Sequence, residues 1–118
     1  MALEPRHGSW FDGLADALLA DWQVARVLAD PVVHAAGQLP GGFTGLVYAR
    51  LHGSPRMYYS AYDPAALDAL KVRLEQAAHA GAGVWCIFDN TAEGAAIDNA
   101  LYFLHTLPVG LHPDRPAV

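Results

Sequence analysis

One stretch decides the fold that this sequence predicts, and it is LVYARLHGSPRMYYSAY at residues 46–62. Its first six residues are mostly apolar and indicate a buried β-strand. Arg50 and His52 stand two residues apart, so both side chains leave the strand on the same face. Asp63 and Pro64 follow as an N-cap and a first helical residue. The stretch therefore predicts a strand, a loop and a helix, with two cation-capable side chains where the strand ends.

Strands and helices alternate through the rest of the chain. Residues 84–88, VWCIF, are apolar at every position, so the strand is apolar on both faces, as expected for parallel strands covered by helices. Alternation with short connections implies parallel strands joined by right-handed crossovers. We therefore predict an α/β fold with about four parallel strands and three main helices. The further strands are expected at residues 2–4, 24–30 and 84–88, and the further helices at about residues 10–21 and after residue 90.

Capping residues and apolar spacing define the helices. Ser9 with Asp12 resembles a capping box before the first helix, and Asn90 with Glu93 forms one before the last. Apolar residues at helical spacing predict which side of each helix is buried. The expected stripes are Phe11, Leu14, Ala15 and Leu18 in the first helix, Leu67, Leu70, Leu74 and Ala77 in the second, and Ile97, Ala100, Leu101 and Leu104 in the third.

Composition narrows the class of protein. Of 118 residues, 53% are hydrophobic and 16% are charged, which fits one folded domain and not a disordered chain. The formal net charge of −5 gives no general support to nucleic-acid binding, although a local basic patch is compatible with it. The single cysteine, Cys86, excludes an internal disulfide. No uninterrupted apolar stretch reaches the roughly 18 residues of a membrane helix, so we expect a cytoplasmic protein.

Each predicted strand ends in polar residues. In α/β proteins, ligands bind at the carboxyl ends of parallel strands, so these side chains should share one end of the sheet. An arginine with a histidine could hold a phosphate or carboxylate. A histidine with a carboxylate could transfer protons, and several of them could ligate a divalent metal. The candidates for proton transfer are His52, Asp89 and Asp30, and those for ligand binding are Glu4, Arg6, His7, Arg50 and Asn90.

The same residues also have structural interpretations. Arg50 and Glu4 could form an interior ion pair that fills a layer of the fold. Asp30, which precedes Pro31, could start a turn. Asn90 is favoured as a helix cap over a site residue. The sequence leaves these alternatives open, because none of the candidates has the fixed spacing of a known catalytic or metal-binding motif.

Three separated segments carry a family resemblance: LEPRHGSWF at residues 3–11, YARLHGSPRMYYSAY at 48–62 and WCIFDNTAEGAAIDNAL at 85–101. They resemble the C-terminal half of the YecE-like family, also called domain of unknown function 72. Its members typically carry E-x-R-H before x-S-W, a strand ending in R-x-H-G, and F-N-N-x-x-x-G-x-A-x-x-N-A. Asp89 departs from the pattern, because the family has an asparagine there. The matching residues are Glu4, Arg6, His7, Ser9, Trp10, Arg50, His52, Gly53, Tyr62, Phe88, Asn90, Gly94, Ala96, Asn99 and Ala100.

The resemblance implies a TIM-barrel-like fold of about twice this length. Residues 1–107 would be its C-terminal half, a partial barrel, followed by an irregular tail at residues 108–118. Arg50 and His52 would then lie at the mouth of the barrel, where such folds bind ligands.

The family has no established activity, so the expected function is half of a small-ligand or phosphate-binding site. A metal-dependent hydrolase, a nuclease-like enzyme or a sugar-directed enzyme is one alternative. A truncated remnant or a self-association module is another, because the first and last strands of a half-barrel are exposed edges.

Overall fold

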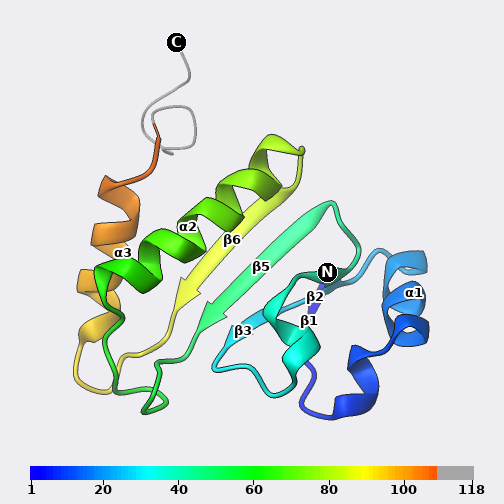
Figure 1. Cartoon of the computed structure of the whole chain (residues 1–118), viewed down its shortest axis with the longest axis horizontal. Helices are drawn as coiled ribbons and strands as arrows, with labels where there is room; N and C mark the ends of the chain where they lie inside the picture. Colours follow the sequence, from blue (N-terminus) through cyan, green and yellow to red (C-terminus); the bar gives the residue numbers. More distant parts are fainter. Residues whose placement is uncertain (109–118) are drawn as a thin grey trace.

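A computed structural model describes residues 1–108 of the chain, and its parallel strands run side by side through the middle of the molecule (Figure 1). The irregular tail expected at residues 108–118 lies outside the described residues, apart from residue 108. No helix in the described part is long and apolar enough to cross a membrane. The strands are β1 (Ala2–Leu3), β2 (Ala25–Arg26), β3 (Leu28–Asp30), β4 (Gly41–Gly42), β5 (Leu46–Leu51) and β6 (Gly83–Phe88).

The strands form two small three-stranded sheets. They are joined by one extended segment of chain, residues 25–30, which contains β2 and β3. One has the order β1-β2-β4 and the other β3-β5-β6. Val27 connects β2 to β3 and donates its backbone N–H to Leu3 O at 2.8 Å, so the parallel pairing with the first strand continues through the junction. The parallel order is therefore β1, β2 with β3, β5 and β6, as the sequence predicts. The short antiparallel pairing of β4 with β2 was not predicted.

Three α-helices accompany the strands: α1 (Gly13–Asp21), α2 (Pro64–His79) and α3 (Ala95–His105). The prediction for α2 is confirmed, with Asp63 as N-cap and Pro64 in the first turn. The first predicted helix is confirmed over Gly13–Asp21, but its expected start at residue 10 and its capping by Ser9 are wrong. Asp12 is extended and accepts a hydrogen bond from Ala15 N at 2.7 Å, so it ends the 3-10 turn η1 (Gly8–Phe11) and starts α1.

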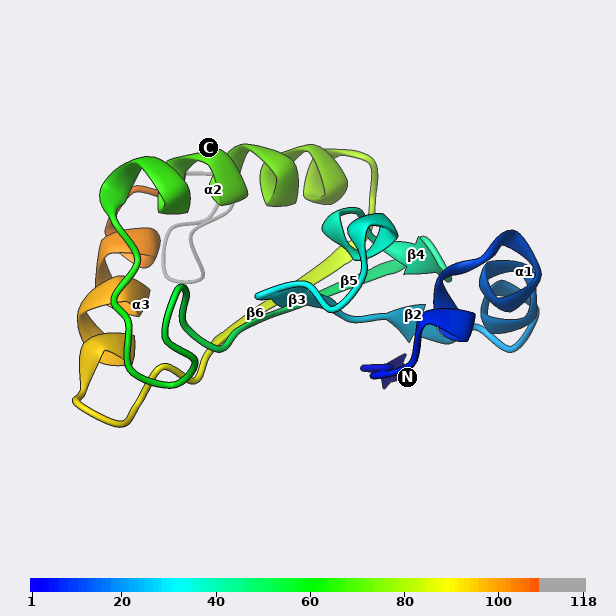
Figure 2. The ribbon, with the colours of Figure 1, turned by 60° about the horizontal axis from the view of Figure 1, so that its bottom comes forward.

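The core lies on one face of the β3-β5-β6 sheet, beneath α2 (Figure 2). Alternate residues of β5 point to this face, because side chains alternate along a strand. They pack against the predicted stripe of α2 and against one residue of α3. The buried residues are Leu28, Val47, Ala49, Leu51, Leu67, Leu70, Leu74 and Phe103.

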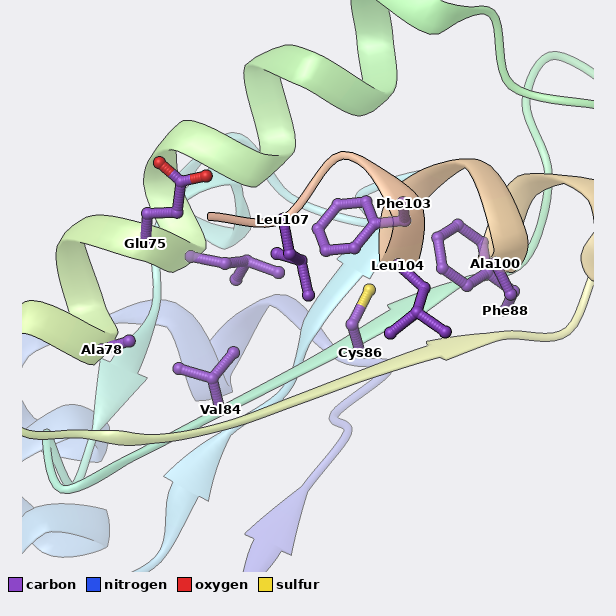
Figure 3. A pocket seen from close by; sticks show the side chains of 10 residues that line it. Glu75, Ala78, Val84, Cys86, Phe88, Ala100, Phe103, Leu104 and Leu107 are labelled. Carbon is purple, nitrogen blue, oxygen red and sulfur yellow. The ribbon is translucent and has the colours of Figure 1, made fainter. Parts of the chain in front are cut away.

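The described residues leave the opposite face of the sheet open. Val84, Cys86 and Phe88 point toward α2 and α3 (Figure 3). Trp85 alternates with them and is 61% exposed. Tyr48 is its neighbour in register on β5 and is half-buried. The described chain therefore covers only one face of this sheet.

Two of the three predicted helix stripes are also wrong. In α1 the buried residue is Leu19, whereas Leu14 and Leu18 are exposed. In α3 the buried residues are Ala96, Asn99 and Phe103, whereas Ile97 and Leu101 of the expected stripe are exposed. Both helices are apolar on more than one side, so spacing alone did not identify the side that faces this chain.

Candidate functional site

Four side chains from three strand ends meet at the carboxyl end of the sheet, and we call them the strand-end cluster: Glu4, Arg50, His52 and Asp89. Glu4 follows β1, Arg50 and His52 come from the end of β5, and Asp89 follows β6. Arg50 bridges the two carboxylates. Its Nη1 lies 2.7 Å from Glu4 Oε2, and its Nη2 lies 2.7 Å from Asp89 Oδ2. The sheet thus brings together residues that are up to 85 positions apart, as the parallel order of the strands predicts.

His52 closes the cluster into a ring. Its Nε2 lies 2.8 Å from Glu4 Oε1, and its Nδ1 lies 2.8 Å from Asp89 Oδ1. The first contact is a hydrogen bond, whereas the second pair is close without hydrogen-bond alignment. The side chain of His52 is 1% exposed. The imidazole therefore lies between two carboxylates, with one ring nitrogen facing each of them.

The ring carries a strong local field. Arg6 Nη2 lies 3.2 Å from Glu4 Oε1 at the exposed rim. Burial alone would raise the pKa of Glu4, but the hydrogen bonds and charges of His52 and Arg50 outweigh it and hold that pKa below its ordinary value. The hydrogen bond to Asp89, with further support from Glu4, raises the pKa of Arg50. The carboxylate of Glu4 is thus stabilised in its charged form.

The depressed pKa of Glu4 predicts a specific pH dependence of stability. A carboxylate whose folded pKa is lowered adds stability above its unfolded pKa of about 4.3, and this contribution disappears as the pH falls through the folded value. The free energy of unfolding of the wild type should therefore exceed that of Glu4→Gln at pH 7. The difference should shrink below about pH 5. Urea titrations over this range measure it.

Glu93→Gln is the matched control, because Glu93 is exposed in the loop before α3. This variant should follow the wild-type curve. A constant difference between wild type and Glu4→Gln from pH 7 to pH 3 would contradict the prediction.

The side chain of Asp30 contacts a tyrosine, whereas its backbone C=O accepts a hydrogen bond from His52 N at 2.8 Å. The hydroxyl of Tyr62 donates to Asp30 Oδ2 at 2.7 Å and accepts from Gly53 N at 2.9 Å. Burial, followed by the hydrogen bond to Asp30, raises the pKa of Tyr62 above its ordinary value. Gly53 has a φ of +101°, which favours glycine. These contacts hold the loop after β5 against the end of β3.

Asn90 is part of a buried amide pair, so its prediction as a helix cap is wrong. The N-cap of α3 is Gly94, which makes no side-chain capping bond. Asn90 Nδ2 donates to Ser60 O at 2.9 Å and to Asn99 Oδ1 at 3.0 Å. Asn99 in turn accepts from Tyr62 N at 3.0 Å and donates to Tyr62 O at 3.1 Å. The pair fixes the same loop from the side of α3.

His7 is exposed, and its Nδ1 accepts a hydrogen bond from Ser9 N at 3.2 Å. It therefore caps η1, and within residues 1–108 its side chain forms no hydrogen bond or ion pair with the strand-end cluster. Within residues 1–108, no group of three or more His, Cys, Asp or Glu side chains is arranged to hold a metal ion. The eight predicted site residues thus divide into four cluster members, Arg6 at the rim, and His7, Asp30 and Asn90 in neighbouring contacts.

A second feature is an apolar cavity of about 560 Å³ between α2, α3 and β6 (Figure 3). Its lining includes Phe88, Phe103 and Leu107, with the carboxylate of Glu75 as the single charged group. Cys86 also lines it, and burial raises the pKa of that thiol to about 12. A neutral thiol in apolar surroundings is a poor nucleophile.

Comparison with known proteins identifies the family. A family model described as "Protein of unknown function DUF72" matches residues 1–117. No curated protein matches the chain. A DUF72 family protein of Thermotoga maritima has a solved structure that is 26% identical, with a TM-score of 0.70, over 86% of this chain and 44% of that chain.

A DUF72 family protein of Enterococcus faecalis is 21% identical and has the same fold. Its two crystal structures give TM-scores of 0.68 and 0.65, each over 88% of this chain and over 46% and 47% of the other chain. This chain therefore spans about half the length of the solved structures that it matches. With a mixed α/β fold and all three predicted motifs, the chain belongs to the DUF72 family.

Proposed function

We propose that this chain is the C-terminal half of a TIM-type α/β barrel and that the strand-end cluster contributes half of a site for a small anionic ligand, such as a phosphate group. Three observations support the barrel: parallel strands in sequential order, a sheet with one open face, and related structures of about twice the length. In such barrels the ligand site lies at the carboxyl ends of the strands.

The observation that carries the proposal is the pair of guanidinium groups beside Glu4. The side chains of Arg6 and Arg50 are 56% and 38% exposed, so both can reach a ligand. Arg50 uses one N–H of each η nitrogen for a carboxylate, and its guanidinium donates to no other acceptor within residues 1–108. A guanidinium has five N–H donors and suits the planar oxygens of phosphate and carboxylate. Arg6 and Arg50 are therefore the proposed anion contacts.

The remaining candidates take supporting roles in this proposal. His52 is the proposed acid or base, because it is the imidazole of the cluster and contacts both carboxylates that bind Arg50. Asp30 and Asn90 hold the loop that follows β5. His7 lies exposed next to Arg6 and can add a contact to a bound anion. A half-barrel has only half of the mouth, so we propose that self-association completes the site.

Inorganic phosphate is the probe that tests the anion site. A ligand that binds only the folded state stabilises it by RT ln(1 + [L]/Kd), about 1.4 kcal/mol at ten times Kd. Thermal unfolding of the wild type should shift upward with phosphate at constant ionic strength, relative to chloride. The shift should disappear in Arg6→Gln.

Arg73→Gln is the control, since Arg73 is an exposed arginine on α2 that is no part of the strand-end cluster. This variant should show the same phosphate-dependent rise in unfolding temperature as the wild type. The proposed anion site would be contradicted if phosphate did not raise the unfolding temperature of the wild type. It would also be contradicted if phosphate raised that of Arg6→Gln equally.

A further inference from the structure

We infer that two copies of this chain pair through one continuous surface: the free edge of β6 and the exposed side of α3 in one copy meet the free edge of β1 and the exposed side of α1 in the other. This inference rests on the half-barrel architecture proposed above and names the partner that completes it.

The exposed side of α1 is an apolar stripe without a partner in the described chain. Leu14 is 84% exposed, Leu18 is 52% exposed, and Trp22 at the C-cap is 76% exposed. A spacing of four residues places these three side chains on the same side of the helix. We call them the α1 stripe. The opposite side of α1 packs through Leu19, which is buried.

The exposed side of α3 is a second apolar stripe. Ile97 is 68% exposed and Leu101 is 46% exposed, and Leu104 lies half-buried beside them. We call Ile97 and Leu101 the α3 stripe. Since Ala96 and Phe103 are buried on another side, α3 presents apolar residues both to the core and away from it. The α3 stripe has no cover within residues 1–108.

Each stripe is at the same end of the molecule as a strand without a second neighbour. Within the described residues, β1 pairs only with β2, and β6 pairs only with β5. Helix α1 lies at the β1 end of the sheet, and α3 lies at the β6 end (Figure 1). A free edge presents unpaired N–H and C=O groups that bind another strand. Each end of the molecule therefore offers an edge together with an apolar helix side.

A second copy fits both ends at once. β1 and β6 run in the same direction, because every pairing from β1 through β2, β3 and β5 to β6 is parallel. A two-fold rotation places β6 of each copy beside β1 of the other, and α3 beside α1, so that the contact occurs twice and closes. The rotation also turns the two open sheet faces, with Trp85 and Tyr48, toward each other. Two copies then match the length of the solved relatives, of which one copy spans 44–47%.

Light scattering on the wild type is the first test. One copy has a mass of 12.6 kDa, and we expect a discrete species of twice that mass which dissociates on dilution. Leu18→Glu in the α1 stripe and Leu101→Lys in the α3 stripe should each give a monomer. Val72→Glu is the matched control, because Val72 is 50% exposed on α2 and belongs to neither stripe. Circular dichroism verifies that each variant is folded.

Mixing the two variants tests which stripes meet. In a mixed pair of Leu18→Glu with Leu101→Lys, one contact has glutamate opposite lysine and the other is wild type in both stripes. The equimolar mixture should therefore regain the doubled mass that neither variant has alone. Leu14→Glu with Ile97→Lys repeats the test at a second pair of positions.

Four results would overturn the inference: a folded wild-type monomer at every concentration, single variants that still pair, a mixture that stays monomeric, or open-ended polymers instead of a closed pair. The anion site is tested separately, since Arg6→Gln should lose the phosphate effect and keep the doubled mass. A wild type that stays monomeric but binds phosphate would overturn this inference and the proposal that self-association completes the site, and it would leave Arg6 and Arg50 as the anion contacts. Pairing without phosphate binding would overturn the proposed function alone.

Discussion

Replacing His52 by leucine is expected to lower the free energy of unfolding by about 3 kcal/mol. Leucine resembles imidazole in volume but has no donor, so the two carboxylates that face His52 lose a partner. Glu4 retains Arg50 and Arg6. Asp89 Oδ1 is buried, and within the described residues its polar neighbour is the imidazole at 2.8 Å. The loss should therefore come from the hydrogen bond to Glu4 Oε1 and from the charged neighbour that buried Asp89 Oδ1 loses.

Urea unfolding of the variant measures this loss, with His105→Leu as the matched control. His105 is exposed at the end of α3, and its replacement should change the free energy of unfolding by less than about 0.5 kcal/mol. The double variant His52→Leu/Asp89→Asn should be less destabilised than the sum of the single variants, because the residues contact each other. Equal stability of His52→Leu and His105→Leu would mean that the ring adds no net stability.

The strand-end cluster was predictable from the sequence because two simple regularities determine it. Parallel strands end at the same side of a sheet, and side chains alternate along each strand. The first brings Glu4 and Asp89 to the end of β5, and the second puts Arg50 and His52 on one face. The sequence could not predict the distances between these side chains. It therefore did not show that one arginine and one histidine would share both carboxylates.

The amide pair was missed for a different reason. Asn90 precedes a helix at a spacing that resembles a capping box, and local patterns favour that role. The structure buries its side chain against Ser60 and Asn99 instead, which depends on how the loop after β5 folds back on α3. One signal was present: Asn99 is three residues after Ala96 and four before Phe103, on the buried side of an otherwise apolar helix.

The predicted buried sides of α1 and α3 were wrong because apolar residues occur on more than one side of these helices. In α2 charged residues separate the apolar positions, and the predicted side is the buried one. In α3 apolar residues occur on both sides, so the spacing supports two answers. The buried side is the one whose asparagine satisfies backbone groups of Tyr62. The other side carries the exposed residues on which the inferred pairing depends.

Arg26 was the clearest signal that the sequence analysis did not use. A charged residue inside a short apolar strand needs a partner, because an isolated buried charge is very costly. The side chain of Arg26 is 3% exposed, and its Nη1 donates to Asp16 Oδ1 at 2.7 Å. Nη2 donates to Ala36 O at 3.2 Å and Leu39 O at 3.3 Å. One guanidinium therefore connects β2 to α1 and to the 3-10 turn η2 (Ala35–Gln38).

Replacing Arg26 by methionine is expected to lower the free energy of unfolding by about 3 kcal/mol. Methionine keeps most of the aliphatic volume, so the loss reports the guanidinium. Two backbone carbonyls and the carboxylate of Asp16 lose their donors together. Asp16 is 39% exposed and can recover hydration, which keeps the effect below that of a fully buried ion pair. Arg73→Met is the control, because exposed Arg73 donates to a single carbonyl, Gln38 O, and should lose less than about 0.5 kcal/mol.

Gly41 provides an independent test of the same contact. A Cβ at this position would lie 2.5 Å from the guanidinium carbon and Nη2 of Arg26 and 2.8 Å from Asp16 Oδ1. Gly41→Ala should therefore cost about 1–3 kcal/mol in the wild type, because the buried ion pair must shift. In the Arg26→Met background the flexible methionine can move aside, so the same substitution should cost clearly less. Such coupling between the two positions is expected only if the guanidinium occupies the space beside Gly41. Strictly additive losses in urea unfolding would place Arg26 elsewhere and would remove it as the connection between α1, β2 and η2.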